Sequence, residues 1–309
     1  MSQIVLLGPQ RLSPTVGAEV KQRGITGPVA MITAGWQERE EEDSEFREVL
    51  AVPAVNLRLY ARWEEVRQED PEFGELHRSR QDQLRQLSKI YRLRLALLRK
   101  QASKLLAMEG SPELLDPERI HAIDMLKMLD AHHLRRVEEI NGEFEWAVRP
   151  GERASIARHR AELMEILQGC EAIAIAGGHV AVLLNRLRLF NIEPMLRRLT
   201  VFAWSAGAMT LTERIVLFHD SPPQGAGNPE VLELGLGLIP GVVVLPSARH
   251  RLKLEDAGRV ALMVRRLSPS HCVPMDEQER LEWSDSTLSG SAGLRMLRPN
   301  GSVAPLEMS

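Results

Sequence analysis

A serine at a predicted strand-to-helix junction is the residue whose surroundings point most directly to chemistry. The apolar run 199–203 predicts a strand, and Ser205 follows it within Trp-Ser-Ala-Gly-Ala, which opens a predicted helix. Such a sharp turn holds the central side chain above the sheet, where amides at the helix start can face a negative charge. The small residues Ala203 and Gly207 let strand and helix approach. The pattern indicates a nucleophile; the alternative is an ordinary N-cap serine.

A serine hydroxyl needs a proton acceptor, and that acceptor usually needs a carboxylate to orient it. The chain offers three histidines and two acids downstream of the serine: His219, His250, His271, Glu213 and Asp220. The residue types alone leave the choice among them open.

A pair of glycines forms a second candidate element. Gly177 and Gly178 follow the predicted strand 172–176 directly, so their bare backbone amides can face a developing oxyanion. A tight turn without chemistry explains the pair equally well.

The composition excludes several classes of protein. The chain has 309 residues, 44% of them hydrophobic, which is ordinary for a folded globular protein. With 39 basic and 42 acidic side chains its formal charge is −3, so no strongly basic field is present to hold nucleic acid. No apolar run approaches the roughly 20 residues of a membrane helix. The two cysteines, Cys170 and Cys272, suit a reducing compartment, and we expect a cytoplasmic protein.

The elements around the serine alternate between strands and helices. Short apolar runs at 4–7, 29–33 and 55–60 are separated by helical stretches, and the same rhythm resumes at 172–176 and continues to 242–245. This spacing predicts an α/β fold whose mostly parallel sheet is covered on both faces. The tail, residues 272–307, predicts short strands forming an antiparallel edge.

A helical insertion interrupts this rhythm. We assign residues 1–60 and 170–309 to the α/β domain and 61–169 to the insertion, which predicts two long amphipathic helices joined by a short turn near Gly110. Asp116 and Pro117 indicate an N-cap and first helical position. Asp130 and His133 occupy the middle of an apolar heptad grid. The insertion either packs on the sheet domain or serves as a homodimerisation or lid element.

Four sequence motifs together resemble one family. In chain order they are Gly-Gly-His at 177–179, Leu-Leu-Asn-Arg-Leu at 183–187, Trp-Ser-Ala-Gly-Ala at 204–208 and Gly-Leu-Gly-Leu at 235–238. Their order and spacing resemble the serine peptidases that include dipeptidase E and cyanophycinase. The resemblance covers residues 1–60 and 170–307. It implies a flavodoxin-like three-layer sandwich of the class I glutamine amidotransferase type.

The resemblance also implies roles for particular residues. Ser205 is similar to the family nucleophile, and Asp220, fifteen residues later, stands where dipeptidase E-like enzymes place the acid of the triad. The amides of Gly178 and Ala206 would form the oxyanion hole.

The chain departs from the family pattern at the histidine. The family histidine directly follows its strand, but Ser247 holds this position here and His250 comes three residues later. Either the loop is shifted so that His250 reaches the serine, or the base has been lost. His179 replaces the usual Asn or Asp and, with Ser247 and Arg249, is a candidate for substrate binding.

These observations predict a serine hydrolase that acts on small peptides or isopeptide-like amides. Neither a metal nor an organic cofactor is expected. The alternative is a catalytically impaired relative that binds a ligand or partner through its helical arm. A cysteine-dependent amidotransferase is disfavoured because neither cysteine lies at a strand-to-helix turn.

Overall fold

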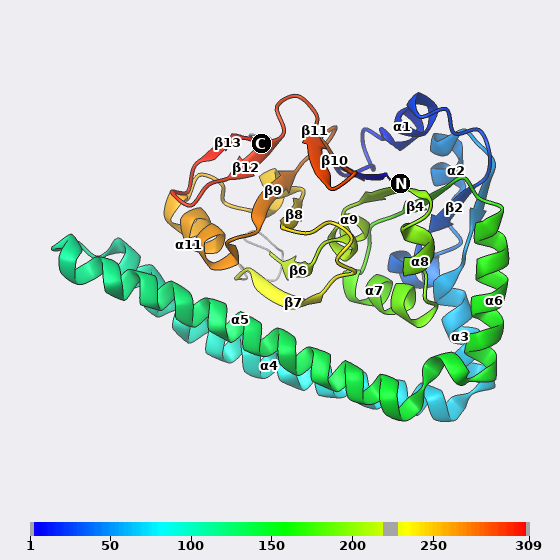
Figure 1. Ribbon diagram of the computed structural model, residues 1–309, viewed down its shortest axis with the longest axis horizontal. Coiled ribbons are helices and arrows are strands. Elements are labelled where there is room, and N and C mark those ends of the chain that lie inside the picture. The colour runs from blue at the N-terminus through cyan, green and yellow to red at the C-terminus, as the bar shows by residue number, and fades with distance from the viewer. Residues whose placement is uncertain (1–2, 219–227, 307–309) are drawn as a thin grey trace.

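The computed structural model describes residues 3–218 and 228–306 and shows an α/β body with a long helical hairpin along one side (Figure 1). Its main sheet has seven strands in the order β11-β10-β1-β5-β4-β2-β3, of which the last five are mutually parallel. The strands are β1 (Ile4–Leu7), β2 (Val29–Ile32), β3 (Ala54–Asn56), β4 (Ala172–Ile175), β5 (Thr200–Trp204), β10 (Arg280–Ser284) and β11 (Thr287–Gly290).

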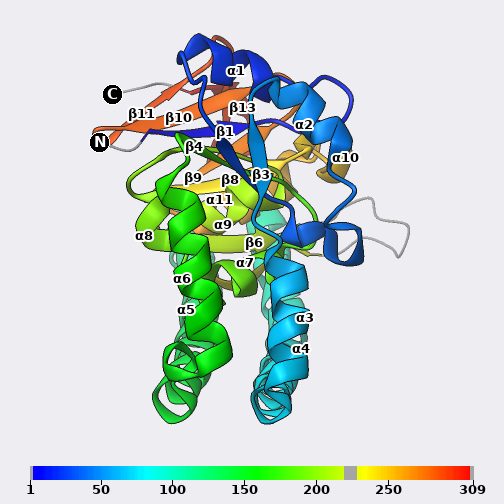
Figure 2. The same ribbon diagram turned by 90° about the vertical axis from the view of Figure 1, so that its right-hand side faces the viewer.

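The central strands are buried on both faces, which explains their continuous apolar sequences. In β1, Ile4 and Leu6 belong to the core on one face, whereas Val5 and Leu7 belong to the core on the other. Helices α1 and α2 cover the second face, and the remaining body helices cover the first (Figure 2). The body helices and short 3-10 turns are α1 (Val16–Gln22), η1 (Ala34–Arg39), α2 (Ser44–Leu50), η2 (Pro150–Glu152), α7 (Val180–Leu189), α8 (Glu193–Leu196) and α9 (Ala206–Leu211). The predicted α/β fold with a parallel-rich sheet is confirmed.

The C-terminal third adds a second sheet. Its strand order is β13-β12-β9-β8, and β6 pairs with β7 separately. These elements are β6 (Arg214–Leu217), β7 (Glu230–Leu234), β8 (Val242–Pro246), α10 (Ala248–Arg251), α11 (Ala257–Leu267), β9 (His271–Met275), β12 (Arg295–Leu297) and β13 (Val303–Pro305). The predicted antiparallel edge is present at β10–β11 and at β12–β13, but β9 pairs in parallel with β8.

The helical region consists of α3 (Leu59–Glu69), α4 (Pro71–Ala107), α5 (Pro112–Val148) and α6 (Ala154–Gln168). Helices α4 and α5 form the predicted hairpin, whose closed end projects past α11 (Figure 1). Helix α5 begins at Pro112 rather than at Pro117, because Ser111-Pro112 provides the same start signal one turn earlier. In the described part of the chain, no helix combines the length and the uncharged apolar stretch needed to cross a bilayer.

The base of the hairpin is part of the main core. Trp63 of α3, Phe73 of α4, Phe144 of α5 and Leu163 of α6 are all buried in the same cluster as the sheet. The rings of Trp63 and Phe73 meet nearly edge to face at 6.0 Å, and those of Phe73 and Phe144 are also 6.0 Å apart. The two ends of the helical region are therefore anchored by apolar packing.

A buried polar cluster, which we call the clamp, anchors the middle of the hairpin. Arg266 of α11 donates to both carboxylate oxygens of Asp130 at 2.7 Å and to the Tyr91 hydroxyl at 2.6 Å. Tyr91 in turn donates to Asp130 at 2.8 Å and accepts from the amide of Val231 in β7. Burial lowers the pKa of the Arg266 guanidinium, but its bonds to Asp130 outweigh this and raise it. The clamp ties α4 and α5 to α11 and β7.

Candidate active site

Ser205 stands between β5 and α9 in a strained backbone conformation. Its φ is 51° and its ψ is −122°, a region that L-residues rarely adopt. Strand β5 lies between β1 and β4 in the middle of the sheet, so this turn is held by pairing on both sides. Such a conformation costs on the order of 1–3 kcal/mol and persists where the surrounding structure enforces it, commonly at functional sites.

Three glycines allow the chain to pack tightly around this serine. A Cβ atom on Gly207 would lie 2.4 Å from the carbonyl oxygen of Ile175, so only glycine lets α9 approach the end of β4 this closely. A Cβ on Gly177 would lie 2.8 Å from the Cβ of Ser205. Gly178 has a φ of +115°, and its Cβ would lie 2.3 Å from the carbonyl oxygen of Gly35. Gly177 is therefore fitted directly against Ser205, and Gly178 is fitted against Gly35 of η1.

Gly178 and Ala206 line the same cavity as Ser205. Neither of their backbone amides has a hydrogen-bond partner within residues 3–218 and 228–306. Ala206 is the first residue of α9, whose amide has no acceptor within the helix. Two unpartnered donors beside a hydroxyl are what stabilisation of an oxyanion requires.

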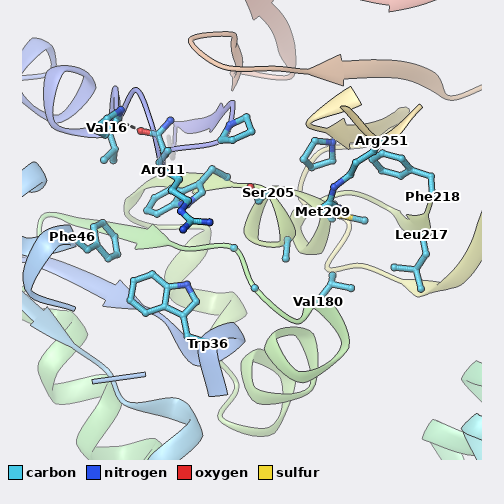
Figure 3. A pocket seen from close by; sticks show the side chains of 18 of the residues that line it. Arg11, Val16, Trp36, Phe46, Val180, Ser205, Met209, Leu217, Phe218 and Arg251 are labelled. Carbon is cyan, nitrogen blue, oxygen red and sulfur yellow. Dashed lines mark hydrogen bonds between the residues drawn. The ribbon is translucent and has the colours of Figure 1, made fainter. Parts of the chain in front are cut away.

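The cavity has a volume of about 820 Å³, within the usual range for small-molecule sites. Arg11, Trp36 and Phe46 lie on one side of Ser205, and Phe218 and Arg251 lie on the other (Figure 3). The ring of Phe46 packs edge to face on Trp204 at 5.0 Å. This arrangement gives the cavity one aromatic wall, although aromatic residues are only 4% of the chain.

Charged groups of both signs line the cavity. Arg11 and Arg251 are cationic, and Glu42, Glu45 and Glu230 are acidic. Burial raises the pKa of the Glu230 carboxyl, while Arg92 and Arg266 oppose this change. A small zwitterionic molecule can therefore find partners for both of its charged ends.

The structure does not bring His250 to this cavity. His250 is exposed on the one-turn helix α10, where its amide donates to the carbonyl of Ser247 at 3.1 Å. No histidine lines the cavity among the residues that the structure describes. Asp220 and His219 lie outside the described residues.

The three predicted substrate-binding residues also lie outside the cavity lining. The ring of His179 accepts from the amide of Val182 at 3.3 Å and so caps α7. Ser247 adopts a left-handed conformation (φ 56°, ψ 40°) directly after β8. The amide of Arg249 donates to Asp276 at 3.0 Å.

Several cavity residues were not predicted from the sequence. Arg11 lies in a loop, Trp36 in η1, Phe46 in α2 and Glu230 at the start of β7, and no local motif marks them. Because aromatic residues are scarce in this chain, each of them deserved consideration as a functional residue, and this was the only sequence signal for Trp36 and Phe46. Both cysteines are buried, and burial raises the pKa of the Cys272 thiol to about 12, which leaves it protonated.

The contact between Gly177 and Ser205 gives a direct test of the geometry. We expect Gly177→Ala to lower catalytic efficiency by about 10²-fold, because the new methyl group must displace the serine and misplace its hydroxyl. The control is Gly142→Ala in α5, where nothing lies within 4 Å of the added atom, and its activity should be unchanged. Steady-state kinetics on both variants makes the comparison, and equal activity would contradict this geometry.

Comparison with known proteins gives no family assignment. No protein-family model matches the chain, and no curated protein matches it in sequence. Among solved structures, the chain is similar to a peptidase from an acI-B1 Actinobacterium, with 13% identity over 97% of this chain and 91% of that chain, at a TM-score of 0.46. It is also similar to a candidate peptidase E from Listeria monocytogenes EGD-e, with 10% identity over 94% of this chain and 98% of that chain, at a TM-score of 0.44.

Proposed function

We propose that this protein is a serine hydrolase that cleaves small peptides or isopeptide-like amides. The observation that carries the proposal is the strained Ser205 beside two unpartnered amides on the wall of one cavity. The order of the sequence motifs further supports kinship with dipeptidase E and cyanophycinase and a flavodoxin-like arrangement of the body.

In the proposed mechanism, the Ser205 hydroxyl attacks the carbonyl carbon of the scissile amide. The amides of Gly178 and Ala206 donate to the resulting oxyanion. His250 takes the serine proton and returns it to the leaving amine, and Asp220 orients the imidazole. Water then hydrolyses the acyl-enzyme by the same route. This assignment requires α10 to turn toward the cavity, because His250 is exposed where the structure places it.

The cavity supports small peptides rather than long chains. Its volume of about 820 Å³ accommodates a few residues. Glu42 and Glu45 can pair with a terminal ammonium group, and Arg251 can pair with a terminal carboxylate. The aromatic wall offers an apolar surface to the side chain beside the scissile bond.

A panel of free dipeptides, tripeptides and β-linked isopeptides tests the proposal. We expect the protein to hydrolyse members of the panel and to slow when either terminus is blocked, since the charged ends then lose their partners. Released amine is measured with time. A folded protein that cleaves no member would contradict the proposal.

The identity of the base can be tested separately. We expect His250→Ala to lower kcat at least about 10²-fold, the usual contribution of a general base. His271→Ala, which removes another exposed imidazole, serves as the matched control and should retain activity. If His250→Ala keeps full activity, the base assignment is wrong. A gain of activity in Ser247→His would then show that the base was lost from the position after β8.

A second candidate function is that of a catalytically impaired binding protein. The absence of a histidine among the described cavity-lining residues favours it. This candidate predicts that peptides bind in the cavity without being cleaved, which isothermal titration calorimetry would detect.

A further inference from the structure

Exposed apolar side chains are concentrated on the hairpin. In the described part of the chain, eleven large apolar side chains are exposed, and ten of them lie between residues 71 and 148. They are Leu76, Ile90, Leu93, Leu97, Met108, Leu114, Ile120, Met125, Met128 and Trp146. Single exposed apolar residues are ordinary, but a contiguous group marks an interaction surface.

Five of these residues form one group, the outer patch: Ile90, Leu93 and Leu97 of α4 with Met125 and Met128 of α5. Within each helix they recur at spacings of three or four, so they share one face. That face is turned away from the buried side of the helix, and Leu93 is 68% exposed and Met128 65% exposed.

The clamp fixes the alignment of the two helices within the outer patch. Because Tyr91 donates to Asp130, these residues lie at the same height along the antiparallel pair. Leu93 comes two residues after Tyr91 in α4, and Met128 comes two residues before Asp130 in α5. Because the helices are antiparallel, these two residues lie at the same height. Figure 2, viewed along the hairpin, shows α4 and α5 side by side with the body on one side only.

The two helices carry opposite net charge. Helix α4 contains nine Lys or Arg against three Asp or Glu. Helix α5 contains nine Asp or Glu, of which Asp130 is buried in the clamp, against four Lys or Arg. Two hairpins stacked by a twofold axis along their length bring each α4 onto the other copy's α5. An axis across their length would instead stack α4 on α4 and α5 on α5. Attraction between opposite charges favours the first arrangement.

We propose that two copies of this chain associate through the outer patch to form a four-helix bundle in which α4 of each copy packs on α5 of the other. Every neighbouring pair of helices in this bundle is antiparallel, as in common four-helix bundles. Each helix has 37 residues and so is about 55 Å long. A face about 55 Å long and two helices, or about 20 Å, wide has an area of about 1,100 Å². This area exceeds the roughly 800 Å² that each partner buries in a standard interface.

The molar mass in solution tests this association. We expect light scattering after size-exclusion chromatography to give the mass of two chains for the wild type and of one chain for the double variant Leu93→Glu with Leu97→Glu. Leu12→Glu, at a site 78% exposed and outside the hairpin, is the matched control and should remain dimeric. Circular dichroism melting verifies that each variant is folded. A monomeric wild type, or a double variant that stays dimeric, would overturn the proposal. Binding of a different protein to the hairpin would not rescue it.

Crosslinking tests the arrangement of the helices. Both native cysteines are buried, so only the introduced surface cysteines are accessible to form disulfides between chains. We expect an equilibrated mixture of Leu93→Cys chains and Met128→Cys chains to form mixed disulfide dimers on oxidation, more than either chain does by itself. Preferential crosslinking of Leu93→Cys chains to each other would overturn the pairing of α4 with α5.

Discussion

Ser205→Ala is expected to lower kcat for peptide hydrolysis by at least about 10³-fold while leaving the protein folded. The side chain lines the cavity and is the only proposed nucleophile, so its loss removes the covalent step entirely. Alanine accepts the same backbone position nearly as well as serine does. The thermal midpoint should therefore change little, and the measurement is a progress curve on the best substrate of the peptide panel.

A second serine provides the control for this variant. Ser155 of α6 is 8% exposed, and its hydroxyl has no hydrogen-bond partner among the described residues. Ser155→Ala should therefore retain full activity. Equal activity in Ser205→Ala and Ser155→Ala would mean that hydrolysis occurs elsewhere or arises from a contaminant.

Asp130→Ala is expected to lower the free energy of unfolding by about 3–5 kcal/mol, more than any other single substitution proposed for this protein. Asp130 and Arg266 are both only 4% exposed at their side chains, and the change leaves the guanidinium buried without its counterion. Tyr91 and the carbonyl of Pro229 remain as partners, but neither carries a charge. Chemical denaturation measures the change in the free energy of unfolding.

The paired replacement separates the ion pair from the packing. Asp130→Leu combined with Arg266→Leu removes both charges, and we expect it to cost clearly less than Asp130→Ala alone. The exposed pair of Arg136 and Glu139 is the surface control, where Glu139→Ala should cost less than about 1 kcal/mol. If Asp130→Ala proved as mild as Glu139→Ala, the clamp would not hold the hairpin as described.

The turn at Ser205 and the two long helices could be predicted because short stretches of sequence encode them. The strand before Ser205, the small residue Gly207 and the Gly-Gly pair are encoded within about thirty residues, and the structure places them together. Helix periodicity likewise marked α4 and α5, because an apolar stripe has to repeat along each helix. The start of α5 was misplaced, since two prolines gave equivalent signals. The run 55–60 was predicted as one strand, but β3 ends at Asn56 and α3 begins at Leu59.

Long-range contacts could not be predicted. Asp130 was identified as a polar residue within an apolar stripe, but its partner Arg266 is 136 residues away and belongs to another helix. Similarly, nothing in the sequence near Glu40 indicates its partners. Its buried carboxylate accepts from the amides of Tyr60 and Ala61 and caps α3, twenty residues later. Sequence spacing carries no information about which distant elements meet.

Mapping the site of covalent labelling by a fluorophosphonate probe shows whether Ser205 is the nucleophile. We predict one adduct per chain, located by tandem mass spectrometry on the peptide that contains Ser205, and none in Ser205→Ala. A folded protein that remains unlabelled, or an adduct on any other residue, would contradict the assignment of Ser205 as the nucleophile.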